Sequence, residues 1–124
     1  MRNQKQQHGE KGESIAVEQL KKNGYKILER NYRTKMGEID IIAKDGDVIV
    51  FIEVKARQTG TYGNPKYAVT WTKQKKIART AQFYLKSTNQ LDKRARFDVV
   101  AIHLKENRQS IEIIQNAFDL TGMS

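Results

Sequence analysis

The chain of 124 residues contains no cysteine, a single proline, and no apolar run long enough to cross a bilayer. The absence of cysteine excludes disulfide bonds and thiolate metal sites. The first residues also lack the pattern of an export signal. We therefore expect a soluble, cytoplasmic protein that does not associate with membranes.

The length bounds the organisation of the chain. A protein of 14.3 kDa has the size of one ordinary domain, and a domain of this size buries roughly two thirds of its unfolded surface. No repeat, low-complexity tract or composition shift divides the sequence. We expect a single domain over residues 1–124, of which residues 1–9 form a disordered polar tail.

Acidic residues are almost absent from one third of the sequence. Residues 55–96 contain eleven Lys or Arg and one acid, Asp92, so this segment carries +10 while the whole chain carries +9. A concentrated basic region is typical of proteins that bind polyanions, because Lys and Arg neutralise phosphates and release counterions. A solvated surface or a docking site for an acidic protein would have the same composition.

Apolar periodicity and turn residues predict seven elements. They are a helix at 10–23, strands at 25–33, 39–43 and 48–54, a helix at 72–86, and strands at 96–104 and 110–116. The segment at 58–69 contains two glycines and the only proline, and is predicted to be a loop.

The stretch GEIDIIAKDGDVIVFIEVK, residues 37–55, has the pattern of a β-hairpin with charges inside its apolar strands. If Asp45 and Gly46 form the turn, Asp40 lies opposite Phe51, and Glu53 becomes its diagonal neighbour. Asp40, Glu53 and Lys55 then share one face of the sheet. The same register places Glu38 opposite Glu53.

Carboxylates crowded between apolar residues repel one another and lose hydration, so they require compensation. Lys55 supplies part of it, and a structural salt-bridge cluster is one interpretation. A divalent cation is the other, since Mg²⁺ prefers oxygen ligands and is commonly bound by one or two carboxylates, water and substrate phosphate. A metal beside a basic region indicates phosphodiester chemistry.

Glu13 has the spacing of an inward-facing residue, three and four positions before Ala16 and Val17 on the apolar stripe of the first helix. It is therefore a further candidate metal ligand. The alternative is an acid that only stabilises the helix N-terminus.

These residues resemble a known signature. Asp40, twelve residues, and then Glu53-Val54-Lys55 resemble the PD-(D/E)XK nuclease motif, with Ile39 in place of proline. Nearly the whole chain is similar to the bacterial YraN family of predicted endonucleases, which is related to archaeal Holliday junction resolvases. The similarity is carried by GEKGESIAVEQLKKNGYKILERNYR, GEIDIIAKDGDVIVFIEVKAR, the Lys-rich helix and RFDVVAI.

The resemblance implies an α/β restriction-endonuclease-like fold, with a mixed sheet of four or five strands flanked by helices in an αβββαβ core. It implies that Glu13, Asp40 and Glu53 bind metal. It further implies that Lys55 positions or activates the attacking water.

The expected function is Mg²⁺- or Mn²⁺-dependent endonucleolytic hydrolysis of DNA in repair or recombination. Selectivity is expected for structure, such as branched or single-stranded DNA, because no base-reading motif is present. A non-catalytic nucleic-acid-binding module on the same fold is the alternative, and either a monomer or a homodimer is compatible with the sequence.

Two further sets of residues complete the expectations. The candidate phosphate contacts are Arg57, Lys73, Lys76 and Arg79, the last three being spaced by three on the second helix. Trp71 and Tyr84 are expected to pack in the core, with base stacking as the alternative role.

Overall fold

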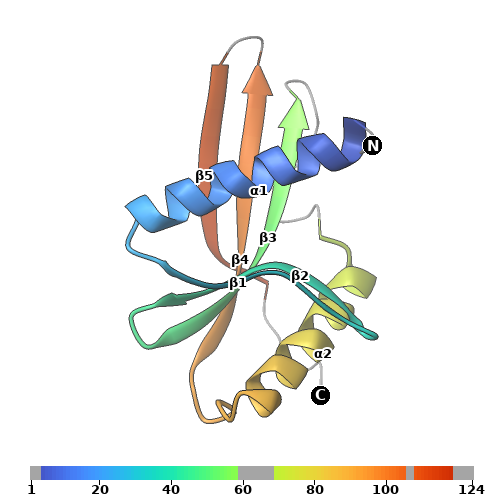
Figure 1. Ribbon diagram of the computed structural model, residues 1–124, viewed down its shortest axis with the longest axis vertical. Helices are drawn as coiled ribbons and strands as arrows, with labels where there is room; N and C mark the ends of the chain where they lie inside the picture. The colour runs from blue at the N-terminus through green and yellow to red at the C-terminus, as the bar shows by residue number, and fades with distance from the viewer. Residues whose placement is uncertain (1–3, 59–68, 106–107, 119–124) are drawn as a thin grey trace.

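The computed structural model describes residues 4–58, 69–105 and 108–118, with side chains described for 12–56, 69–104 and 108–118. Two helices and five strands follow one another along the chain (Figure 1). They are α1 (Gln4–Lys22), β1 (Lys26–Thr34), β2 (Gly37–Asp45), β3 (Val48–Gln58), α2 (Trp71–Ser87), β4 (Ala95–Lys105) and β5 (Arg108–Phe118). This order confirms the predicted αβββαβ core and its additional strand.

The strands form one mixed sheet in the order β1-β2-β3-β4-β5. The β3–β4 pair is parallel, and the other three pairs are antiparallel. A parallel pair requires a crossover connection, and α2 lies in the one that joins β3 to β4. The protein is therefore an α/β protein whose mixed five-stranded sheet is consistent with a restriction-endonuclease-like fold.

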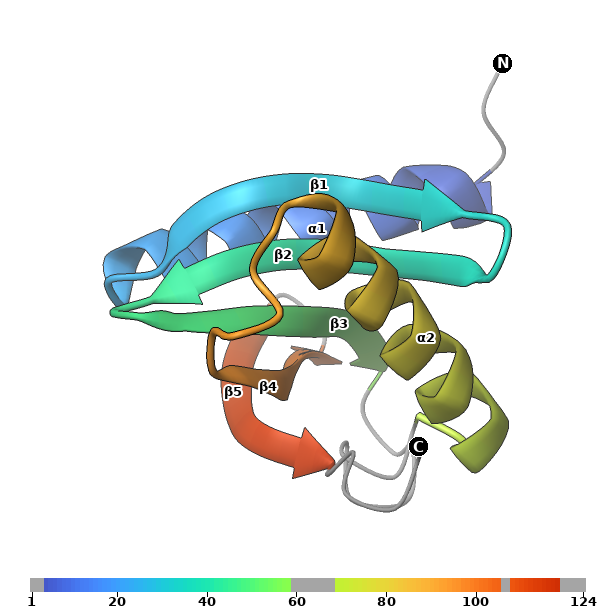
Figure 2. The same cartoon turned by 90° about the horizontal axis from the view of Figure 1, so that it is seen from below.

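The two helices cover opposite faces of the sheet (Figure 2). On one face, Ala16, Val17 and Leu20 of α1 pack against buried residues of β2, β3 and β4. On the other, Ile77 and Ala81 of α2 pack against a second set of buried strand residues. The strands of the sheet centre are apolar on both sides because each face is covered.

The second helix begins one residue before the predicted position. Thr70 is its N-cap, and the Thr70 hydroxyl accepts a hydrogen bond from the backbone N of Lys73 at 3.2 Å. Such a cap satisfies one of the free N–H groups of the first turn. Tyr84 confirms its predicted core position, with its ring edge-on to Phe51 at 6.0 Å.

A glycine at the start of β2 lets this strand approach α2 closely. A Cβ atom at Gly37 would lie 3.1 Å from Thr80 Oγ1 and 3.3 Å from Lys76 Cβ. Thr80 is fully buried, and its hydroxyl donates to the Lys76 carbonyl at 2.7 Å. Any side chain at position 37 would therefore push the first turns of α2 away from β2.

The predicted tail at 1–9 and the predicted loop at 58–69 have different outcomes. The first helix begins at Gln4, six residues earlier than expected, and so includes most of the segment predicted to be a disordered tail. Most of the predicted loop at 58–69 lies outside the described residues. No helix in the described part of the chain is long and apolar enough to cross a membrane.

The β2–β3 hairpin forms as predicted, but its turn is shifted by one residue. Asp45 pairs with Val48, so the turn residues are Gly46 and Asp47 rather than Asp45 and Gly46. Gly46 has φ 61°, which suits the first central position of a tight hairpin turn. Arg96 of β4 contacts the Asp45 carboxylate at 2.7 Å and holds this residue in the strand.

The alternation of side chains between the two faces of the sheet is interrupted in β1 at Asn31, which has φ 54°. Before this residue, Arg30 donates to Ser14 of α1 at 3.4 Å. After it, Tyr32 packs on the α2 side, with its ring 5.3 Å from that of Tyr84. Strict alternation would place Arg30 and Tyr32 on the same face, so the left-handed backbone of Asn31 reverses it.

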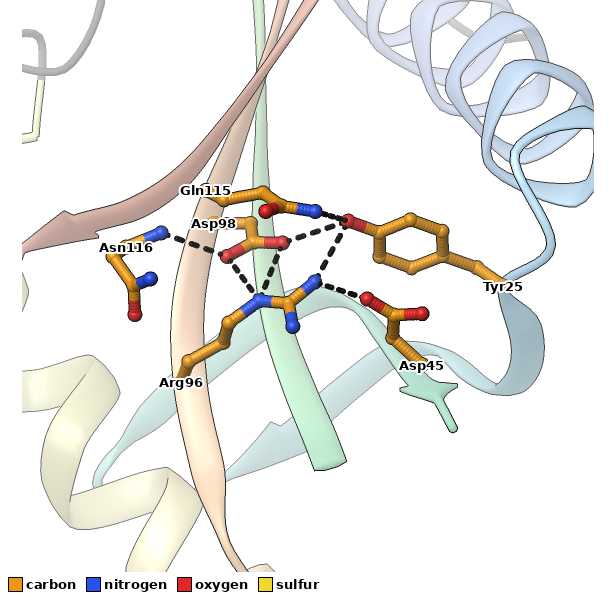
Figure 3. A network of polar contacts seen from close by, with 6 residues as sticks. All are labelled: Tyr25, Asp45, Arg96, Asp98, Gln115 and Asn116. Atoms are coloured by element: carbon orange, nitrogen blue, oxygen red, sulfur yellow. Dashed lines mark hydrogen bonds and ion pairs between the residues drawn. The ribbon is translucent and has the colours of Figure 1, made fainter. Parts of the chain in front are cut away.

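A network of polar groups joins three strands, β2, β4 and β5, and the segment after α1 (Figure 3). Asp98 is fully buried and accepts hydrogen bonds from Arg96 Nε at 3.0 Å, Tyr25 Oη at 3.1 Å and the backbone N of Asn116 at 3.1 Å. Arg96 also contacts Asp45. Every charged group of the network therefore has an opposite charge or a donor, as buried ions require.

We expect Asp98→Ala to destabilise the protein by about 3–5 kcal/mol, because it leaves the mostly buried Arg96 cation with Asp45 as its remaining carboxylate partner. Tyr25→Phe removes one donor to the same carboxylate and one acceptor for Arg96 and Gln115, and should cost about 1–3 kcal/mol. Urea denaturation measures both. An Asp98→Ala protein as stable as the Tyr25→Phe protein would contradict a central role for this ion pair.

Candidate active site

The strands β2 and β3 separate where the two predicted carboxylates stand. The last described pair of their ladder is Ile41–Ile52, and the next residues in this register are Asp40 and Glu53. The backbone N of Val54 donates to Asp40 Oδ2 at 2.9 Å, in place of a continued ladder. The register predicted from the sequence is wrong by one pair, because Phe51 pairs with Ile42 and not with Asp40. Asp40 and Glu53 are the first residues beyond the end of this ladder.

Glu53 is almost completely buried, with 2% of its surface exposed. Its Oε2 atom lies 3.0 Å from the Lys73 ammonium, whereas its Oε1 atom is buried and has no hydrogen-bond partner among the described residues. Burial and the neighbouring Asp40 raise the pKa of the Glu53 carboxyl to about 7, although Lys73 opposes this effect. This carboxylate is thus only half compensated by the protein.

The surrounding groups have correspondingly shifted pKa values. Burial raises the pKa of Asp40, against the hydrogen bond from Val54 and the charges of Lys73 and Lys55. Burial and the adjacent Lys73 lower the pKa of Lys55. Burial also disfavours the charged form of Lys73, but Glu53 outweighs it, so the pKa of Lys73 is raised. Shifted acids and bases in one cluster are typical of functional sites.

Glu13 approaches this cluster from α1. Its side chain is buried, and the Asn31 amide, oriented with its nitrogen toward Glu13, donates to Oε1 at 2.7 Å and to Oε2 at 3.1 Å. Burial and the negative charge of Asp40 raise the pKa of Glu13. The inward orientation predicted from the helical spacing is therefore confirmed, and Asn31 occupies both carboxylate oxygens.

The donor set fits a hard divalent cation held by two carboxylates. Among the described side chains, no three His, Asp or Glu residues are grouped closely enough to hold one metal ion. Asp40, however, is near enough to Glu53 for its charge to raise the Glu53 pKa, and Glu53 Oε1 is buried without a donor. Mg²⁺ commonly takes one or two carboxylates and completes its shell with water and phosphate.

Glu38 does not join this cluster as the predicted register implied. It is exposed and pairs with Arg33 of β1, Oε2 to Nε, at 3.2 Å. Its charge still contributes to raising the pKa of Asp40. An exposed pair of this kind contributes at most about 1 kcal/mol to stability.

The predicted phosphate contacts separate into different groups. Lys76 and Arg79 are exposed on α2, whereas Lys73 turns inward to Glu53. Although Lys73, Lys76 and Arg79 are spaced by three, they therefore do not form one exposed basic surface. The side chain of Arg57 lies outside the described residues. A hollow of about 410 Å³ lies between the start of β2 and the first turns of α2, and Lys73 is the member of the cluster that lines it. It is lined by Gly37, Glu38, Thr70, Thr72, Lys73, Lys76 and Ile77.

Sequence reasoning missed three features of this region. It did not pair Lys73 with Glu53 or Asn31 with Glu13, since both contacts join distant parts of the chain. It also expected Trp71 to pack in the core, which is wrong because 56% of this residue is exposed. As the first residue of α2, Trp71 has no neighbouring turn to cover it, and the apolar stripe of the helix begins only at Ile77.

The fold and the cluster define an α/β protein with a restriction-endonuclease-like sheet and opposed carboxylates and lysines where β2 and β3 separate. The model of the family described as "Uncharacterised protein family UPF0102" matches residues 12–102. The chain belongs to this family, the YraN family of the sequence resemblance.

Relatives named UPF0102 protein cover nearly the full length of the chain. The protein of Desulfosudis oleivorans is 56% identical over 96% of this chain and 95% of its own. That of Geobacter metallireducens is 53% identical over 90% of this chain and 92% of its own. That of Syntrophus aciditrophicus is 52% identical over 90% and 88%, respectively.

The raised pKa of Glu53 predicts a pH-dependent stability. Between pH 4.5, its ordinary pKa, and about 7, the folded protein holds a proton that the unfolded chain has released. The metal-free wild type should therefore lose stability as pH rises through this window. At about 1.4 kcal/mol per pKa unit, the loss from this group is on the order of 3 kcal/mol.

Glu53→Gln should lack this loss, so its stability relative to wild type should increase from pH 4.5 to 7 in urea denaturation with EDTA present. Glu18→Gln, at an exposed position of α1, is the control and should follow the wild type. A Glu53→Gln difference that is constant with pH would contradict the raised pKa.

Proposed function

We propose that this protein is a divalent-metal-dependent endonuclease that hydrolyses phosphodiester bonds in DNA. The observation that carries the proposal is the Glu53 carboxylate, which is buried opposite Asp40 with one oxygen unpartnered. Burying two adjacent carboxylates costs stability. A site that binds a cation gives this cost a function.

Asp40 and Glu53 would hold Mg²⁺ or Mn²⁺, and Glu13 would add a third negative charge beside them. When bound, the ion supplies charge stabilisation at the phosphate and a more acidic water. Lys55 lies beside these groups, and its lowered pKa brings it closer to the neutral form that accepts a proton. We assign Lys55 to orienting the attacking water and taking up its proton.

The exposed cations of α2 are suited to bind the DNA backbone. Lys75, Lys76 and Arg79 are exposed, and the sequence of the helix contains no acid. Contacts of this kind go to phosphates and carry no sequence information. The proposed substrate preference is accordingly for DNA structure, such as branched or single-stranded DNA, in repair or recombination.

We expect Asp40→Ala and Glu53→Ala to reduce Mg²⁺- or Mn²⁺-dependent cleavage by at least about 10²–10³-fold, a typical loss for a group that stabilises the transition state. Lys55→Ala should lose cleavage while it still binds metal, because an ammonium is not a ligand. The assay uses purified protein with branched, flapped, single-stranded and duplex DNA.

Glu18→Ala controls for a general effect of removing an acid, and EDTA controls for metal dependence. Cleavage that survives in Asp40→Ala or Glu53→Ala would overturn the assignment of the site. DNA binding by the wild type without cleavage in any metal would identify a non-catalytic binding module instead.

A further inference from the structure

Among the described residues, Lys73 is the cation that forms a salt bridge with Glu53. It comes from the first turn of α2, and its ammonium lies 3.0 Å from Glu53 Oε2. A cation near a helix N-terminus is disfavoured by the helix dipole, so this placement is explained by the contact with Glu53. The Thr70 cap fixes the backbone from which the side chain extends.

A metal ion and Lys73 would neutralise the same Glu53 carboxylate, so each would weaken the attraction of that carboxylate for the other. Of the two Glu53 oxygens, Oε2 contacts Lys73 and Oε1 has no partner. Lys73 also keeps 41% of its side-chain surface exposed and lines the hollow at the start of α2. The ammonium therefore has room to leave Glu53 without unfolding the helix.

We propose that Lys73 is a built-in counter-cation that neutralises Glu53 in the metal-free protein, leaves it when a divalent ion binds, and then contacts the substrate phosphate. The inference rests on the metal site of the proposed function. It assigns Lys73 two successive partners, a carboxylate and then a phosphate, and so makes it a positioning residue that exchanges places with the metal.

The test measures Mn²⁺ binding by calorimetry without DNA. Lys73→Met removes the competing ammonium, so it should bind Mn²⁺ about three- to tenfold more tightly than wild type, as expected from losing a half-exposed ion pair. Lys75→Met removes the same charge from the exposed side of α2 and controls for long-range electrostatics. Lys73→Arg keeps the cation and should resemble wild type.

Cleavage at saturating Mn²⁺ supplies the second measurement. Lys73→Met should cleave more slowly although it binds metal more tightly, whereas a purely structural lysine would weaken both. Lys73→Gln, which keeps a hydrogen-bond donor, replaces Lys73→Met if that variant does not fold. Mn²⁺ affinity in these variants equal to or weaker than wild type would overturn this inference alone. Absence of Mn²⁺ binding in every protein, wild type included, would overturn the proposed function as well.

The exposure of Trp71 supports a second, independent inference. This residue is the first of α2 and is 56% exposed. The Lys75 ammonium lies 5.1 Å from its ring centroid. Trp71 stands two residues before Lys73, which contacts the buried Glu53 carboxylate. An exposed aromatic ring among cations is suited to stack on a nucleobase while the cations bind the backbone.

We infer that Trp71 stacks on an unpaired base beside the cleavage site, which makes nucleic acid with a single-stranded segment the preferred substrate class. This inference rests on the proposed nuclease function, but it concerns binding and needs no metal. A base inside a duplex has both faces covered, so a blunt duplex offers Trp71 no internal base to stack on.

Trp71 is the only tryptophan of the chain, so intrinsic tryptophan fluorescence reports on this position alone. In EDTA, a single-stranded oligonucleotide should quench this emission, and a circularised duplex, which has no ends, should leave it nearly unchanged. Trp71→Ala should weaken single-strand binding by about tenfold or more, measured by anisotropy of a labelled oligonucleotide.

Phe83→Ala removes another exposed ring of α2, 48% exposed, and is the matched control that should bind like wild type. Equal quenching by both forms of DNA, or wild-type single-strand affinity in Trp71→Ala, would overturn the stacking role. Undiminished duplex binding in Trp71→Ala would then leave the proposed function standing. Loss of all nucleic-acid binding in the wild type would overturn both.

Discussion

The central position of β3 is the constraint on which the rest of the site depends. This strand is hydrogen-bonded to β2 on one side and to β4 on the other, and a helix covers each face. Its first half, Ile49–Ile52, is fully apolar and buried. Glu53 follows in the same strand and is almost completely buried, so its charge must be compensated inside the protein or by a bound cation.

Two buried ionic clusters use this architecture in opposite ways. Asp98, on the α1 side, is saturated by Arg96, Tyr25 and a backbone N–H, so it joins strands at a low cost in unpaired charge. Glu53, on the α2 side, has one oxygen without a partner. A saturated cluster stabilises a fold, while an incomplete one retains affinity for something that is not part of the chain.

The position of α2 determines which cations belong to the incomplete cluster. The absence of a side chain at Gly37 lets β2 approach the helix, and the Thr70 cap sets its first turn. Together they bring Lys73 to Glu53 and leave Trp71 and Lys75 on the outer side. The first turns of α2 therefore carry Lys73, which compensates the buried charge, and also Trp71 and Lys75, which face solvent.

The sequence alone determined the order of the elements and the β2–β3 hairpin. These depend on local rules, namely apolar periodicity, turn residues and the alternation of side chains along a strand. The turn lies one residue later than predicted, which moves the register by one pair and leaves the parity of the paired residues unchanged.

Only the tertiary structure decided the partners of the charges. The contact of Arg96 with Asp45 fixed the turn, and the left-handed backbone at Asn31 turned its amide to Glu13. Lys73 reached Glu53 across twenty residues of sequence. Each of these contacts depends on how a helix packs on a twisted sheet. That packing is set by the summed burial of many side chains, which no local pattern encodes.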